Sequence, residues 1–195
     1  MEKYAILDIE TVPIQFDDIE VVRYQIEKNF TPGLHPAFSK IIIIGIKFGD
    51  ENEPKIFHGE NEKEIISDFW KELNNKKPEL IVTWNGYKFD IPFIEMRSVI
   101  HNIKPEYRIN TNPWKMLEHD SNHIDCMLLF SRQEKFANVS LTIACKLLGI
   151  SVLPSEDMLF GKDVFREYRL KNWQEIVKHC KEDLRMTEEL FKKLY

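Results

Sequence analysis

The sequence has few cysteines, no excess of positive charge and no long hydrophobic run. Its three cysteines, Cys126, Cys145 and Cys180, have no paired spacing, which excludes a disulfide framework or zinc knuckle and predicts reduced, buried thiols. The net charge of -5 argues against a protein that coats duplex nucleic acid, because that mode of binding needs many Lys and Arg contacts to phosphate. It does not exclude a nuclease, since a carboxylate site counts as negative until its cations are bound.

Hydrophobic stretches are too short for a membrane span or a targeting segment. The run 41–46 is flanked by Lys40 and Lys47 and is too short to cross a bilayer. No signal peptide is visible, because the first apolar strand reaches Asp8 too early. With 195 residues and 43% hydrophobic composition, we expect one well-buried domain over residues 1–195 in a soluble, cytoplasmic protein.

The order of the predicted elements indicates the fold class. Strands are expected at 5–11, 40–48, 55–58, 79–84 and 123–130, and helices at 17–29, 60–74, 89–103, 138–148 and 172–194. The first three strands suggest a meander, and helices and strands then alternate, which is typical of an α/β domain with a mixed central sheet. Residues 14–39 are interpreted as a flap beside the first strand. In helix 89–103, Phe93, Met96, Val99 and Ile100 mark the expected apolar face.

Two acids interrupt the first apolar strand. Asp8 and Glu10 point to the same face, about 7 Å apart along the strand, because strand side chains alternate. Two carboxylates together on a buried strand are costly, so such a pair implies a bound cation or unusual pKa values. The alternative is a strand end at which both acids reach water.

Two further acids stand in suitable settings. Asp90 follows the turn Asn85-Gly86, where a strand gives way to a helix, and ligand sites of α/β sheets gather at the carboxyl ends of strands. The alternative is that Asp90 only caps the helix. His179 and Asp183 are four residues apart and share one helix face. They could form a surface pair, but Asp183 is interleaved with apolar residues, and a carboxylate on a buried stripe needs a partner.

These acids fall into three ordered motifs. Asp8-Ile9-Glu10 matches Asp-x-Glu, Asn85 through Asp90 matches Asn-x-x-x-Phe-Asp, and Asp183 supplies the last acid. The chain thus resembles the DEDD superfamily of 3′-5′ exonucleases, which implies a ribonuclease-H-like fold with about five strands flanked by helices. It is most similar to stand-alone relatives of the proofreading domain of family B DNA polymerases, in which a segment like 34–38 also leads into the second strand.

The resemblance implies a metal-dependent 3′-5′ exonuclease that removes nucleoside 5′-monophosphates from single-stranded DNA ends. Two Mg²⁺ or Mn²⁺ ions would be held by Asp8, Glu10, Asp90 and Asp183. Hard oxygen ligands suit these metals, and a pair of ions can activate water and stabilise the leaving oxygen. It further suggests a role in DNA repair or proofreading, with a polymerase or repair protein as partner.

The same resemblance places Thr11, Asn85 and Phe89 near the 3′-terminal nucleotides. Stacking of bases on aromatic groups tolerates any sequence, which suits an exonuclease. For Phe89, packing in the core at the start of the helix is an equal alternative. Trp84 and Phe93 are assigned to the core.

His179 is where the chain departs from the family pattern. The polymerase-like branch carries Tyr four residues before the last Asp, the other branch carries His five residues before it, and here His occupies the Tyr position. With an ordinary pKa near 6.5, His179 could act as general base around neutrality. Alternatively it only hydrogen-bonds the attacking water, or it faces elsewhere.

Other functions share these motifs. An exoribonuclease on short RNA would use the same site. A non-catalytic nucleic-acid or partner-binding module could retain the fold, but such a module has no physical reason to keep four acids that repel one another without cations.

Two polar segments are given structural interpretations. Residues 119–125 contain two His and two Asp, but the spacing fits no zinc pattern, so we interpret them as a loop that enters a strand. Basic residues before the last helix either line a strand path or form a solvated helix face: Lys162, Arg166, Arg169 and Lys171.

Overall fold

The computed structural model describes residues 3–31, 33–118, 121–154, 159 and 161–195. The strands are β1 (Tyr4–Pro13), β2 (Ser39–Phe48), β3 (Lys55–His58), β4 (Leu80–Thr83) and β5 (His123–Asp125). The helices are α1 (Ile19–Lys28), α2 (Glu62–Lys76), α3 (Asp90–Ile100), α4 (Cys126–Phe130), α5 (Leu141–Leu147), α6 (Gly161–Arg169) and α7 (Trp173–Leu194), with a 3-10 helix η1 (Pro113–Lys115). The strand order is β3-β2-β1-β4-β5. Because β1 is antiparallel to β2 and parallel to β4, the predicted mixed α/β sheet is confirmed.

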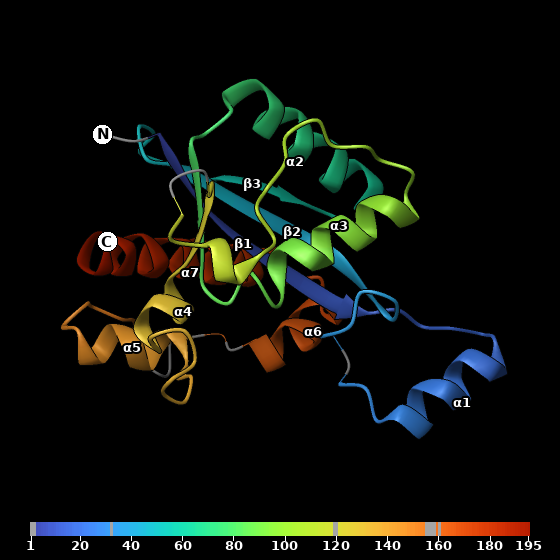
Figure 1. The fold of residues 1–195 in the computed structure, drawn as a ribbon. Coiled ribbons are helices and arrows are strands. Elements are labelled where there is room, and N and C mark those ends of the chain that lie inside the picture. Colours follow the sequence, from blue (N-terminus) through green and yellow to red (C-terminus); the bar gives the residue numbers. More distant parts are fainter. Residues whose placement is uncertain (1–2, 32, 119–120, 155–158, 160) are drawn as a thin grey trace.

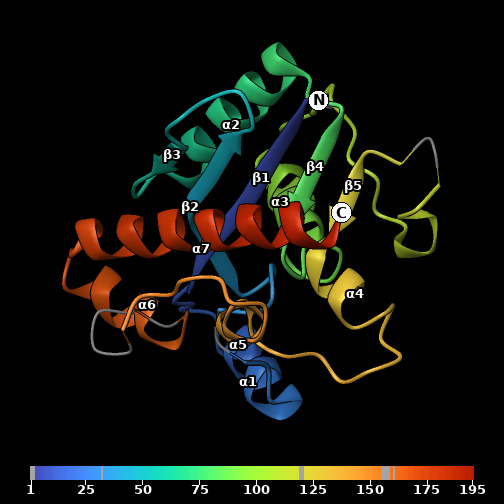
Figure 2. The same cartoon turned by 90° about the vertical axis from the view of Figure 1, so that its left-hand side faces the viewer.

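Helices cover both faces of the sheet (Figure 1). One core contains Leu7 and Ile9 with residues of α2 and α3, and the other contains Ile6 with residues of α7. Figure 2 shows α7 lying across the strands on this second face. Since side chains alternate along β1, Asp8 and Glu10 follow Ile6 toward α7. The strand pleat therefore decides which helix the two acids meet.

Helix α7 packs unusually close to the sheet at Gly45. Gly45 is the partner of Asp8 in the β1–β2 register. A Cβ at this position would lie 2.5 Å from Sγ of Cys180 and 2.8 Å from Cδ1 of Leu184, closer than atoms of neighbouring side chains can approach. The missing side chain lets α7 approach the acid-bearing part of β1.

The predicted strand 123–130 is wrong beyond Asp125. The chain enters α4 at Cys126, because Oδ1 of Asp125 accepts a hydrogen bond from the backbone N–H of Met127 at 2.9 Å and another from that of Leu128 at 3.4 Å. Such capping satisfies N–H groups that the first helical turn leaves free. An apolar run that reads as a strand thus becomes a short helix.

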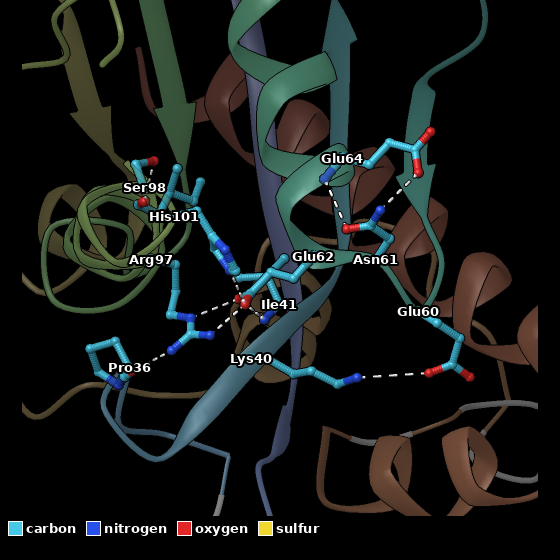
Figure 3. Close-up of polar contacts among 11 residues, drawn as sticks. Pro36, Lys40, Ile41, Glu60, Asn61, Glu62, Glu64, Arg97, Ser98 and His101 are labelled. Carbon is cyan, nitrogen blue, oxygen red and sulfur yellow. Dashed lines mark hydrogen bonds and ion pairs between the residues drawn. The ribbon is translucent and has the colours of Figure 1, made fainter. Parts of the chain in front are cut away.

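The predicted apolar face of α3 is also largely wrong. Phe93 is buried, but Met96, Val99 and Ile100 are 48%, 70% and 47% exposed. Arg97 is buried instead, because its guanidinium donates to the buried carboxylate of Glu62 on α2, with Nε 2.8 Å from Oε1 (Figure 3). An ion pair therefore helps to decide which face of α3 turns toward the core, and the spacing of hydrophobic residues does not predict such a pair.

The predicted flap contains α1, which has no buried residue and projects away from the sheet in Figure 1. All three cysteines are free and buried, as expected. Among the described residues, none of the helices has the length and apolar character needed to cross a membrane.

Candidate active site

Of the two acids of β1, Glu10 is buried and Asp8 is half-buried on the α7 side. Glu10 is 7% exposed, and Oδ2 of Asp8 is buried without any hydrogen-bond partner. The alternative in which both acids simply reach water is therefore wrong. A sealed carboxylate oxygen without a donor is energetically costly, and this cost is what the site must offset with another group.

Asp90, the first residue of α3, bonds to the strand between these two acids. Its Oδ1 accepts a hydrogen bond of 3.2 Å from the backbone N–H of Ile9, the residue between Asp8 and Glu10. The N-cap of α3 is Phe89, with no side-chain capping bond, so the interpretation of Asp90 as an ordinary helix cap is wrong. Its hydrogen bond instead joins the start of α3 to the middle of the acidic strand.

Helix α7 brings His179 and Asp183 to the same place. Nδ1 of His179 lies 3.8 Å from Oδ1 of Asp183, and its Nε2 lies 3.4 Å from Oε1 of Glu10. The side chains of His179 and Asp183 are only 10% and 22% exposed, which rules out the surface pair. The predicted neighbourhood on one helix face is confirmed, and it faces β1.

Burial and mutual repulsion perturb every acid in the cluster. Burial first, and then the neighbouring carboxylates, raise the pKa values of Asp8 and Glu10 far above their ordinary range. Burial is also the main reason that the pKa of Asp90 rises to about 8 and that of Asp183 to about 7. Desolvation disfavours each charged form, and like charges add to the effect. The cluster therefore favours bound protons or a bound cation.

Burial acts on His179 in the opposite direction. It lowers the pKa of His179 to about 4, because a buried imidazole resists becoming charged. At neutral pH this side chain is a neutral imidazole beside Glu10, able to accept a proton.

The acids fit a divalent cation by chemistry rather than by a finished coordination geometry. In the described part of the chain, no three Asp, Glu, His or Cys side chains are arranged so that they could already hold a metal ion. The donor set nonetheless consists of hard carboxylate oxygens, the ligands that Mg²⁺ and Mn²⁺ prefer. One of them, Oδ2 of Asp8, is a buried acceptor without a donor. The residues therefore fit such an ion, provided that the side chains rotate toward it.

Asp125 is a positioning residue that the sequence analysis missed. Its carboxylate accepts hydrogen bonds from the backbone N–H groups of Asn85 at 2.9 Å and Tyr87 at 3.2 Å, and it is 1% exposed. It thereby fixes the loop that carries the second acidic motif. Its place at the end of a short strand could have revealed it, but the longer strand predicted for this region hid that signal.

An open cleft adjoins the acids. It has a volume of about 410 Å³ and is lined by Glu10 and Thr11 of β1, Phe89, and residues of the flap and α6. Phe89 also packs against the α2–α3 core and lies 5.3 Å from the ring of Phe93, so its two suggested roles are compatible. Asn85 does not line this cleft; its Oδ1 is buried without a partner.

The remaining predicted residues divide between the cleft and the scaffold. Lys162 lines the cleft, whereas Arg166 pairs with Asp163 and Glu167, and Lys171 pairs with Glu60. Of the core assignments, Phe93 is buried, while Trp84 is only half-buried.

The segment 119–125 is expected to be a loop that enters a strand. Residues 119 and 120 lie outside the described residues. The following segment does enter β5, where the buried ring of His123 lies 2.9 Å from Oγ1 of Thr83.

The fold is ribonuclease-H-like, with acids from β1, α3 and α7 brought together around Asp8. A solved structure of the family B DNA polymerase from Pyrobaculum calidifontis matches it with a TM-score of 0.75 and 15% sequence identity, over 100% of this chain and 24% of that chain. At this identity the match establishes the fold alone.

Residues 34–194 match the family model of predicted 3′-5′ exonucleases related to the exonuclease domain of PolB. The chain belongs to this family and is a nuclease-type domain of the 3′-5′ exonuclease class, which confirms the resemblance drawn from the three motifs.

Curated relatives agree with this assignment. An uncharacterized protein of Methanocaldococcus jannaschii is 27% identical over 171 residues, which cover 83% of this chain and 89% of the relative. The DNA polymerase of Archaeoglobus fulgidus is 30% identical over 105 residues, or 53% of this chain. A catalytic polypeptide of DNA polymerase epsilon from Dictyostelium discoideum is 30% identical over 137 residues, or 57% of this chain. The matched regions are only 13% and 6% of these two polymerases.

Proposed function

We propose that residues 1–195 form a divalent-metal-dependent exonuclease domain that removes nucleoside 5′-monophosphates from the 3′ ends of single-stranded DNA. The observation that carries this proposal is the convergence of Asp8, Glu10, Asp90 and Asp183, each with a raised pKa. A structural protein gains nothing from burying such a cluster. A phosphodiesterase gains a site whose net charge is balanced when cations and substrate arrive.

In this proposal the four acids hold two Mg²⁺ or Mn²⁺ ions. When bound, such ions polarise the terminal phosphodiester and stabilise charge on the leaving 3′ oxygen. The hydrogen bond from Ile9 to Asp90 keeps one ligand aligned with β1, and the packing of α7 at Gly45 keeps Asp183 within reach of the others. The chain thus supplies the ligand positions from three separate elements.

His179 is proposed as the general base. Its neutral imidazole can take a proton from the attacking water, while Glu10 and Asp183 stabilise the imidazolium that forms. A positioned base typically contributes about 10²–10⁴-fold to a rate. We therefore expect His179→Ala to lower kcat at least about 100-fold with little change in KM, measured by nucleotide release. Near-full turnover by this variant would contradict the role.

Thr11 and Phe89 are proposed to contact the 3′-terminal nucleotide in the 410 Å³ cleft beside Glu10. The ring of Phe89 offers a surface for stacking that does not depend on base identity. Asn85 would act through the conformation of its loop or by turning its buried amide toward the substrate.

The test compares 3′-recessed, blunt and single-stranded DNA with matching RNA, in Mn²⁺ and then in chelator, beside an Asp8→Ala control. We expect metal-dependent shortening of single-stranded DNA from the 3′ end, lost in the control. Cleavage of RNA alone would instead identify an exoribonuclease. If neither is cut and added Mn²⁺ does not raise the melting temperature, the domain is a binding module. A polymerase or repair partner and a cytoplasmic location stay predictions.

A further inference from the structure

A second, smaller cavity is lined in part by the loop that leads to Asp90. It has a volume of about 90 Å³, and its lining includes Tyr87, Lys88, Trp114, Leu128, Gln133 and Glu134. The three segments that meet here are the β4–α3 loop, η1 and the turn after α4. None of these residues belongs to the cleft beside Glu10.

The walls of this cavity are aromatic and apolar. Trp114 is 81% exposed, whereas Tyr87 and Leu128 are 8% and 5% exposed and form a rigid floor. The hydroxyl of Tyr87 donates a hydrogen bond of 2.9 Å to the backbone carbonyl of His123, which fixes its ring. An exposed indole and fixed apolar side chains that line one cavity are suited to holding a flat aromatic ligand.

Part of the cavity is polar. The lining includes Gln133 and an ion pair between Lys88 and Glu134. The side chain of Lys88 is 57% exposed. An amide offers both donors and acceptors to the edge of a base, and an exposed ammonium can contact a phosphate.

The turn that forms one side is conformationally strained. Arg132, Gln133 and Glu134 have φ values of 53°, 57° and 62° in succession, although none is glycine. Hydrogen bonds from the N–H of Gln133 to the carbonyl of Leu128 at 2.7 Å and from that of Glu134 to Oγ of Ser131 at 3.1 Å hold the turn in place. Strained backbone that is held in this way is often found where a protein clamps a ligand.

We propose that this cavity is a nucleobase subsite that holds the base of the nucleotide preceding the 3′-terminal one. This inference rests on the proposed exonuclease function. Lys88 lines this cavity, and the next residue, Phe89, lines the cleft beside Glu10. A single-stranded DNA that crosses the loop before Asp90 therefore reaches both. Trp114 stacks on the base, Gln133 contacts its edge, and Lys88 leaves Glu134 to contact the linking phosphate.

The first experiment measures binding without cleavage. In an Asp90→Asn background with Mg²⁺, titration calorimetry compares the trinucleotide of thymidine with thymidine 5′-monophosphate. Loss of one stacked base weakens binding substantially, so we expect Trp114→Ala to weaken trinucleotide binding about tenfold and to leave mononucleotide binding unchanged. Trp114→Phe should retain most of the affinity while losing the quenching of indole fluorescence by the trinucleotide. Leu117→Ala, a neighbouring residue that is 62% exposed, should behave like the parent.

Equal trinucleotide affinity in Trp114→Ala and its parent would overturn the subsite, as would an equal loss for the mononucleotide or the absence of trinucleotide binding in the parent. The proposed function can fail separately. If the unmodified protein cuts nothing but shows Trp114-dependent binding, only the cleavage is refuted. If it cuts single strands with the same KM after Trp114→Ala, only the subsite is refuted. Circular dichroism confirms that each variant is folded.

Discussion

Glu62 and the acids of the candidate active site differ in how far the chain supplies them with hydrogen-bond donors and cations. Glu62 is 6% exposed, yet its carboxylate accepts hydrogen bonds from Arg97 and from the backbone N–H of Ile41 at 2.7 Å, and it lies 2.7 Å from Nε2 of His101 (Figure 3). Burial alone would raise its pKa, but these partners outweigh burial, and the pKa is lowered. Asp8 is half-buried as a residue, but its pKa is raised and its buried Oδ2 has no donor.

The difference teaches that burial alone does not identify a functional acid. Both groups are removed from water, but Glu62 receives a guanidinium and a backbone N–H from its own chain, whereas Asp90 accepts a backbone N–H and has no Arg or Lys partner in the described part of the chain. Arg97 also donates a hydrogen bond of 3.1 Å to the carbonyl of Pro36, so this network ties α2, α3 and the entry to β2 together. In the described part of the chain, no Lys or Arg pairs with Asp8, Glu10, Asp90 or Asp183, and the basic side chain beside Glu10 and Asp183 is the neutral imidazole of His179. This lack of a cation points to a ligand from outside.

The largest expected effect separates activity from stability. Asp90→Asn should reduce nucleotide release by about 1000-fold or more, a loss typical when a group that stabilises the transition state is removed. In chelator at pH 8, the same variant should be more stable by about 1 kcal/mol or more, because it removes a buried, repelled charge. Paired nuclease assays and urea unfolding curves measure the two effects. A variant that loses both activity and stability would mean that Asp90 is mainly structural.

A loss of stability is expected when the partner of Glu62 is removed. Arg97→Ala leaves Glu62 buried and short of its cation, which should lower the free energy of unfolding by about 3–5 kcal/mol. Arg185→Ala serves as the matched control, because Arg185 pairs with Glu182 and Glu189 at a more exposed position, where such pairs contribute about 0–1 kcal/mol. If urea unfolding gave similar losses of unfolding free energy for both variants, the buried pair would contribute no more than the exposed one.

Asp125 is a third kind of buried acid: its hydrogen bonds within the described residues all come from backbone N–H groups. Burial, its main influence, raises the pKa of Asp125, and its hydrogen bonds oppose the shift. Asp125→Asn keeps the shape but replaces one acceptor with a donor, so we expect the Asn85–Asp90 loop to shift and kcat to fall about tenfold, or about 1.4 kcal/mol. Crystal structures of both proteins would show the displacement. Unchanged kcat with an unmoved loop would remove Asp125 from the positioning role.

The smallest effect is a pH dependence with two opposite slopes. Glu62 has a lowered pKa, so its contribution is present above its ordinary value of 4.5 and is lost as the pH falls. Asp90 and Asp183 have raised pKa values, so the favourable protonated state is complete below about pH 3.8 and is lost as the pH rises to about 8 and 7, respectively. In chelator, each slope should amount to about 1 kcal/mol per pH unit.

Single variants assign these slopes. Glu62→Gln should reduce the change of unfolding free energy with pH on the acid side of the curve. Asp183→Asn should reduce it near neutral pH. Urea unfolding between pH 3 and pH 9 measures both, and slopes that survive both substitutions would show that other groups cause them.

The sequence by itself determined the strands that carry the site and the side chains that face together. The alternation along the first strand places Ile6, Asp8 and Glu10 on one face of that strand. The four-residue spacing places His179 and Asp183 on one face of the last helix. Both follow from local backbone geometry. The resemblance of the three motifs was enough to indicate the exonuclease family. These properties depend only on residues close together in the chain.

Only the tertiary structure decided which buried acids have partners. The inward turn of Arg97, the hydrogen bonds from Asn85 and Tyr87 to Asp125, and the approach of α7 to Gly45 all involve residues far apart in sequence. Hydrophobic spacing therefore predicted the wrong face for α3. The strand at β5 was predicted too long for a local reason, because the apolar pattern outweighed Asp125 as a helix cap. Whether a buried acid stabilises this protein or needs a bound cation depends on which distant donors the fold brings to it. The local sequence pattern does not predict those donors.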